Sequence, residues 1–245
     1  MFWLVSVLIL SSFAHCNEDL LRQFQICKRS DPQLNDCLKS AIQQSINILK
    51  NGLPQYNIPS MNPINIPKWT MPKGGILSYE QKYTNIELHD YPTTVILAVT
   101  SKIEDDDFSL SLKCTAPILK VKCNYRYDDA KLGGVDVSSV GSLIYTYYDR
   151  DFYITFTGGI LNNGSGRYLL ISDTQINITR IGSFTVKYES ENLAAADLLT
   201  KLSYENLDTL LTVNKGGYDD MYATGLKNIA NAVFAAIPYD KLFPK

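Results

Sequence analysis

The side chains of this 245-residue chain that could support chemistry are five cysteines, two histidines and one run of acidic residues. Beyond the first 16 residues, the only histidine is His89, which stands beside Asp90. A lone histidine is more often a hydrogen-bonded structural residue than a catalytic base. The chain also contains no G-x-S-x-G, H-E-x-x-H or P-loop pattern. We therefore predict a protein that is not an enzyme and that binds no cofactor.

The acidic run from Glu104 to Asp107 raises the question of a calcium site. An EF-hand loop supplies carboxylate and carbonyl oxygens at fixed spacings around an invariant glycine. This run has neither the spacing nor the glycine. Four adjacent acids on a tight turn also point in different directions, which favours a solvated surface. We expect a solvated hairpin tip and no bound metal.

The first 16 residues carry no charged side chain and pass from an apolar run to the small-residue pattern Ala14-His15-Cys16. This arrangement indicates a secretory signal peptide over residues 1–16, with a buried N-terminal strand as the alternative. The run is too short to anchor the chain in a bilayer. We expect a single secreted, extracellular domain over residues 17–245. On the secretory route the sequons at Asn163 and Asn177 become acceptors for N-glycosylation.

Removal of the leader leaves an even set of cysteines: Cys27, Cys37, Cys114 and Cys123. In an oxidising compartment an even count favours disulfides, and four cysteines permit three pairings. Residues 108–114 and 119–127 both alternate apolar and polar side chains, as strands do. A hairpin near Pro117 would set Cys114 opposite Cys123 on the apolar side. We predict the bridges 27–37 and 114–123.

Hydrophobic periodicity predicts helices towards both ends of the chain and strands between them. A first helix is expected from about Pro32 to Lys50, and the Pro-rich stretch from Pro54 to Pro72 is expected to form an edge strand or cover. Further strands, separated by turns, are expected at 143–149, 152–157, 168–171, 176–179 and 183–188. A helical region over 193–213 is expected to break at 214–217. The last helix, 218–237, combines a wide apolar stripe with small residues, which suits enclosure by a curved sheet.

The charge of the chain points to no macromolecular partner. Lys and Arg total 23 against 25 Asp and Glu, which gives a net charge of −2. There is no basic cluster to neutralise phosphates and no cationic amphipathic face. We expect no nucleic-acid partner, no stable membrane insertion and a monomeric protein.

Three stretches of the sequence carry a resemblance to a known family. One is the C-terminal run Ile237-Pro238-Tyr239-Asp240-Lys241-Leu242-Phe243-Pro244. The others are the pair Cys27 and Cys37, and Ala116-Pro117-Ile118-Leu119 leading to Tyr125. Together they resemble the takeout and juvenile-hormone-binding protein family of insects over essentially the whole mature chain. Cys114 and Cys123 depart from the second cysteine pair associated with the hormone carriers of that family.

The resemblance implies an α+β fold in which a strongly curved antiparallel sheet wraps a long C-terminal helix, the super-roll of TULIP-like proteins. It also implies an internal tunnel for a small lipophilic ligand such as juvenile hormone, a terpenoid or a fatty acid. Amphipathic tyrosines suit an apolar pocket that orients its ligand with a few hydroxyls. The residues predicted to contact the ligand are Leu38, Ile42, Tyr125, Tyr127, Tyr222, Leu226, Ile229 and Val233.

The apolar stripes leave two alternatives open, because a face that lines a cavity and a face that packs into a solid core have the same periodicity. A filled core would indicate a secreted interaction or signalling protein that acts through its surface. A third alternative is a binder of microbial lipids in defence. Internal volume distinguishes the first two, and the chemistry of the ligand distinguishes a carrier from a defence protein.

Overall fold

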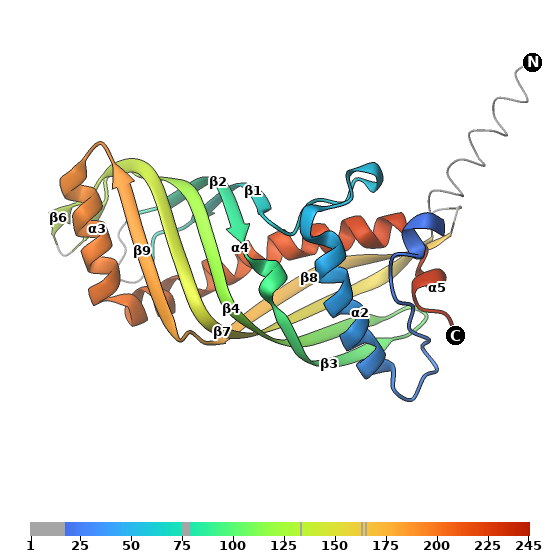
Figure 1. Cartoon of the computed structure of the whole chain (residues 1–245). Helices are drawn as coiled ribbons and strands as arrows, with labels where there is room; N and C mark the ends of the chain where they lie inside the picture. Colours follow the sequence, from blue (N-terminus) through green and yellow to red (C-terminus); the bar gives the residue numbers. More distant parts are fainter. Residues whose placement is uncertain (1–17, 75–78, 133, 163, 165) are drawn as a thin grey trace, which may run out of the picture.

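A curled antiparallel sheet surrounds the C-terminal helix in the computed structural model of the protein (Figure 1). The structure describes residues 18–74, 79–132, 134–162, 164 and 166–245. The expected signal peptide over residues 1–16 and the sequon residue Asn163 lie outside these ranges. Within them the main sheet has seven strands, and two further short strands pair with each other.

The helices and strands are named here in chain order. The helices are α2 (Leu34–Ile48), α3 (Leu193–Glu205), α4 (Leu207–Ala236) and α5 (Tyr239–Leu242). The strands are β1 (Ile64–Met71), β2 (Gln81–His89), β3 (Val95–Ile103), β4 (Phe108–Tyr127), β5 (Lys131–Leu132), β6 (Val135–Asp136), β7 (Ser139–Asn162), β8 (Arg167–Arg180) and β9 (Ser183–Ser190). Short 3₁₀ turns occur at η1 (Leu49–Asn51), η2 (Pro54–Tyr56) and η3 (Tyr91–Thr93).

Two very long strands form the middle of the sheet. β4 has 20 residues and β7 has 24, and they pair antiparallel along almost their whole length. β3 and β8 flank this pair at the end of the molecule that holds α2 and α5, whereas β2 and β9 flank it towards α3 (Figure 1). The sheet therefore has two halves that share β4 and β7.

The last helix closes the curled sheet. α4 packs against the edge strands β8 and β1 and runs along both halves (Figure 1). The expected architecture, a long C-terminal helix wrapped by a strongly curved antiparallel sheet, is confirmed. The edge strand expected within the Pro-rich stretch is confirmed as β1, which pairs on one side with β2.

The inward faces of β4 and β7 change parity at one level of the sheet. In β4 the buried positions are even-numbered up to Ala116 and odd-numbered afterwards. In β7 they are mainly odd-numbered before Arg150 and even-numbered from there on. Between these levels the pairing skips Pro117, which has no N–H, and Asp149, which has a φ of 52°. Because both strands change parity together, the register survives and both halves keep their apolar faces inward.

The expected hairpin near Pro117 is wrong, and so is the expected bridge between Cys114 and Cys123. β4 continues through this point, which leaves the two cysteines nine residues apart on one strand, roughly 30 Å at about 3.3 Å per residue. Both thiols are free and buried. The change of face that indicated a turn belongs instead to a continuous strand. The bridge between Cys27 and Cys37 is confirmed, with Cα atoms 5.8 Å apart.

Three other predicted interruptions are also wrong. β7 continues through residues 149–151, and β8 joins the two strands expected at 168–171 and 176–179. α4 continues through residues 214–217, although glycine usually weakens a helix. Close packing against β1 explains the glycine at position 217, because a Cβ there would lie 2.6 Å from Met71 Sδ.

The buried thiols lead to a prediction for chemical labelling. Burial raises the pKa of both Cys114 and Cys123 to about 12, so little thiolate exists at neutral pH. Iodoacetamide should therefore leave both cysteines unmodified in the native protein and alkylate both after unfolding without reductant. Peptide mapping by mass spectrometry measures this, with the disulfide-linked peptides of Cys27 and Cys37 as the internal control. Recovery of a peptide that links Cys114 to Cys123 would contradict the structure.

Candidate functional site

A cavity of about 200 Å³ lies inside the half of the sheet that α2 covers. Its wall is formed by α2, α4, the inward faces of β3, β4 and β7, and the C-terminal segment. The wall is apolar except at a few side chains: Gln25, Ser45, Tyr91 and Thr94. An apolar cavity of about 150 Å³ is already enough to hold a benzene molecule. The space is therefore suited to a small lipophilic molecule.

Two helix faces and one face of the sheet supply most of the wall. α2 contributes Leu38, Ala41, Ile42, Ser45 and Ile46. α4 contributes Leu226, Ile229, Ala230, Val233 and Phe234. The long strands contribute Phe108, Leu110, Leu112, Phe152, Ile154 and Phe156. The helix positions recur every three or four residues, which places them on one face of each helix.

The eight residues predicted to contact a ligand fall into two groups. Five of them line the cavity: Leu38, Ile42, Leu226, Ile229 and Val233. The other three, Tyr125, Tyr127 and Tyr222, are buried but do not line it. Helical periodicity thus selected cavity residues correctly, whereas the alternation of the strands selected inward residues without showing which half of the interior they occupy.

Tyrosine side chains cluster in the half of the interior nearer α3. Tyr127 Oη lies 3.0 Å from Tyr83 Oη and 3.4 Å from Tyr188 Oη. Tyr83 Oη also donates to Gln81 Oε1 at 2.8 Å, and the rings of Tyr125 and Tyr127 have centroids 4.8 Å apart. The hydroxyls that we expected to orient a ligand therefore have partners in the protein, since Tyr125 Oη also lies 3.2 Å from Ser139 Oγ and Tyr222 Oη lies 3.4 Å from Tyr145 Oη. Among the described residues, the cavity thus lies in the half that α2 covers, and a packed cluster of tyrosines lies in the half nearer α3.

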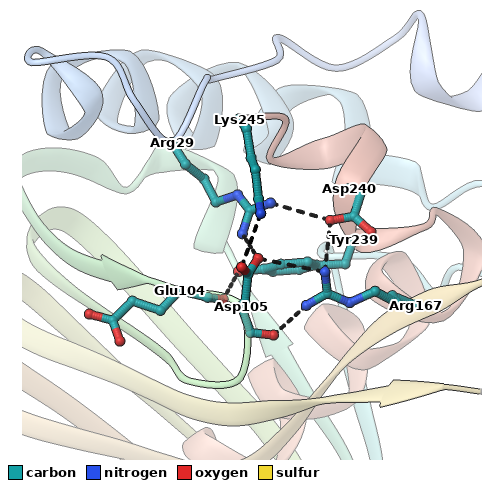
Figure 2. A network of polar contacts seen from close by, with 7 residues as sticks. All are labelled: Arg29, Glu104, Asp105, Arg167, Tyr239, Asp240 and Lys245. Atoms are coloured by element: carbon teal, nitrogen blue, oxygen red, sulfur yellow. Dashed lines mark hydrogen bonds and ion pairs between the residues drawn. The ribbon is translucent and has the colours of Figure 1, made fainter.

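A network of ion pairs fixes the C-terminal segment at the outer end of the cavity (Figure 2). Asp105 Oδ1 accepts Arg29 Nη1 at 2.7 Å, and Asp105 Oδ2 accepts Lys245 Nζ at 3.1 Å. Asp240 Oδ1 accepts Arg29 Nη2 and Arg167 Nη1, each at 3.3 Å. These charges join the N-terminal segment, the β3–β4 tip, the start of β8 and the C-terminus.

Tyr239 lies at the centre of this network (Figure 2). Its hydroxyl donates to the Glu104 carbonyl oxygen at 2.6 Å. The guanidinium carbons of Arg29 and Arg167 lie 5.2 and 5.6 Å from the centroid of its ring, a cation–π arrangement. The following residues Leu242 and Phe243 line the cavity. The network therefore holds these two side chains against the outer end of the cavity.

The acidic run from Glu104 to Asp107 forms a hairpin tip, as expected, with Glu104 N–H donating to the Asp107 carbonyl at 2.9 Å. The Asp105 side chain at this tip is half exposed and also pairs with three cationic side chains, which the sequence did not indicate. Sequence reasoning missed the network because its members lie far apart in the chain. In the sequence, the charged residues of the C-terminal motif were the feature that could have indicated ion pairs at this end of the chain.

The remaining candidates for chemistry do not assemble into a site within the described ranges. His89 Nε2 lies 2.9 Å from Glu87 Oε2 at the end of β2, away from the cavity wall. No group of three or more His, Cys, Asp and Glu residues that could hold a metal ion occurs among the described residues. None of the described helices is long and apolar enough to cross a membrane.

Comparisons with known proteins confirm the fold and the family resemblance. A family model described as haemolymph juvenile hormone binding protein matches residues 4–244. The circadian clock-controlled protein daywake of Drosophila melanogaster is 24% identical over 247 residues, covering 96% of this chain and 94% of the relative. Its Drosophila yakuba counterpart is 22% identical over 226 residues, covering 88% and 86%. The crystal structure of Epiphyas postvittana Takeout 1 has a TM-score of 0.72 at 11% identity, covering 90% of this chain and 100% of that chain.

The network at the outer end of the cavity leads to a prediction about acid stability. The hydrogen bond from Arg29, followed by that from Lys245, lowers the pKa of Asp105 from 3.8 to about 2. A carboxyl group whose pKa is lowered by folding stabilises the native state above its unfolded pKa, and this contribution is lost as the pH falls towards 2. Asp105→Asn should therefore lower the melting temperature at neutral pH, and the difference from the unchanged protein should vanish near pH 2.

Asp106→Asn is the matched control, because Asp106 lies beside Asp105 on the same tip and forms no ion pair with a described residue. Thermal unfolding followed by circular dichroism across this pH range provides the measurement. Equal melting temperatures for the two variants at neutral pH would show that the network does not stabilise the fold.

Proposed function

The chain belongs to the haemolymph juvenile hormone binding protein family, and we propose that it is a secreted, monomeric carrier that sequesters a small lipophilic ligand between α2 and α4. The observation that carries the proposal is the cavity of about 200 Å³ with its apolar wall. Both helices contribute mainly apolar side chains to this wall. The family name supports a lipophilic ligand, and the proposed classes are juvenile hormones, other terpenoids and fatty acids.

The proposed mechanism is removal of apolar ligand surface from water. Burial of about 400 Å² at about 25 cal/mol per Å² provides about 10 kcal/mol before the costs of association. Dissociation constants between micromolar and nanomolar are then within reach. Sequestration of this kind needs no reactive group, which agrees with an apolar wall that contains only a few hydroxyl and amide side chains.

Native mass spectrometry tests whether a ligand is present. The full chain is expressed through a eukaryotic secretory pathway, purified without detergent, and extracted with organic solvent. We expect a discrete adduct that the solvent releases as a lipid, and its chemistry distinguishes an endogenous hormone or fatty acid from a microbial lipid. A bare mass that persists after challenge with juvenile hormones, terpenoids and fatty acids would support a filled-core interaction protein instead.

A bulky side chain in the cavity should weaken binding. Ala230 lines the cavity on α4, whereas Ala235 lies on the exposed side of the same helix. Ala230→Trp should weaken binding of a fluorescent fatty-acid analogue by at least about tenfold, because the indole occupies the space of the ligand. Ala235→Trp is the control and should bind like the unchanged protein. Equal affinities for the two variants, both folded by circular dichroism, would place the ligand elsewhere.

A further inference from the structure

One arginine is buried in the interior at the boundary between the cavity and the tyrosine-rich half. Arg150 on β7 is 1% exposed. None of its three guanidinium nitrogens forms a hydrogen bond of acceptable geometry with a described residue. Arginine remains protonated in proteins, and a buried charge without a partner is strongly unfavourable. The structure therefore contains at this boundary a positive charge that forms no ion pair with a described carboxylate.

Aromatic rings surround the guanidinium. Its carbon lies 4.6 Å from the centroid of the Tyr222 ring and 5.3 Å from those of Tyr147 and Phe152. Cation–π contacts offset part of the cost of desolvation but provide no acceptor for the five N–H groups. The charge of Asp219 contributes to a raised pKa of Arg150. Its Oδ2 pairs with Lys215 and its Oδ1 is buried without a hydrogen-bond partner, but neither oxygen forms an ion pair with Arg150. The Tyr91 hydroxyl, which is uncharged, interacts with the guanidinium, and no described carboxylate forms an ion pair with it.

The inner end of the cavity lies beside this arginine. Phe152 belongs both to the cavity wall and to the ring cage of Arg150, and the wall residue Tyr91 lies close enough to interact electrostatically with the guanidinium. Thr94 directly precedes β3 at the level where β4 Ala116 pairs with Arg150. Thr94 Oγ1 is buried on the wall and also lacks a hydrogen-bond partner among the described residues.

The outer end of the cavity differs in its electrostatics. Arg29 and Arg167 at that end both pair with Asp105 and Asp240. These cations already have carboxylate partners. By contrast, the inner end combines a cation that forms no ion pair with a described carboxylate and an unpartnered hydroxyl, in a region of low dielectric where charge interactions are strong.

We propose that the inner end of the cavity, between Tyr91, Thr94 and Phe152, holds the carboxylate head group of a long-chain acid, with Arg150 as its counter-charge. This assignment rests on the proposed carrier function and adds the ligand class and its orientation. Thr94 Oγ1 donates to the carboxylate, and the Arg150 guanidinium, which contacts the Phe152 ring of the wall, provides the positive charge. The alkyl chain extends towards Phe108 and Phe243 at the outer end.

Matched ligands test the head group. Dodecanoic acid and methyl dodecanoate have the same chain, but only the acid is charged near neutral pH. The full chain should bind the acid at least about tenfold more tightly, because hydrogen bonds to charged groups are the strong ones. Arg150→Met should remove this preference while keeping affinity for the ester, and Arg150→Lys should retain part of it. Arg180→Met, at an exposed arginine on β8, is the control and should leave the preference unchanged.

Three outcomes separate the two proposals. If neither ligand binds, the head-group assignment is wrong, and the carrier function is wrong as well if juvenile hormones and terpenoids also fail to bind. If the unchanged protein binds both ligands equally, or Arg150→Met keeps the preference for the acid, the carrier stands and the head-group assignment is overturned. Should Arg150→Met fail to fold, the carboxyl carbon of ¹³C-labelled dodecanoic acid bound to the unchanged protein still decides. Its NMR titration should show a carboxyl pKa below that of the free acid, whereas a raised pKa would contradict a neighbouring cation.

Discussion

The interior of this protein depends on one constraint, which is that β4 and β7 keep an apolar face turned towards α4 while the sheet curls. Successive side chains of a strand point to opposite faces of the sheet. A change of parity in only one of the two strands would therefore turn the apolar side chains beyond that point towards solvent. The skipped pair Pro117 and Asp149 avoids this because both strands change parity at the same level. Pairing continues in register on either side, and the two halves of the sheet can fill their interiors independently.

The interiors of the two halves are packed differently. Near α3, tyrosines cluster and their hydroxyls have partners in the protein, so polar atoms are buried without cost in unmade hydrogen bonds. Near α2, aliphatic side chains and phenylalanines leave a volume unfilled, which is tolerable only if it stays apolar or receives a ligand. The division falls at the parity change, where Arg150 pairs with the small residue Ala116.

Local periodicity predicted the features that depend on a single element. The apolar faces that include Ile42 on α2 and Ile229 on α4 follow from helical spacing, and the fold class followed from a family motif. The hairpin at Pro117 was mispredicted because a turn and a change of parity within a continuous strand produce the same shift in the apolar–polar alternation. The two can be distinguished only from the pairing with the neighbouring strand. Neither the pairing of Arg29 with Asp105 nor the cage around Arg150 has a local signature, since the curl of the sheet brings these residues together.

The two ends of the cavity give an amphipathic ligand a direction. At the outer end every cation of the network has a carboxylate partner, and these groups are partly exposed to water, so an additional anion gains little there. At the inner end Arg150 is shielded from water and forms no ion pair with a described carboxylate. Folding has already removed its hydration shell, so a bound anion would supply the favourable interaction that water no longer provides. Binding of a carboxylate therefore gains more electrostatic energy at the inner end of the cavity than at the outer end. This difference orients a carboxylate ligand with its head group towards Arg150.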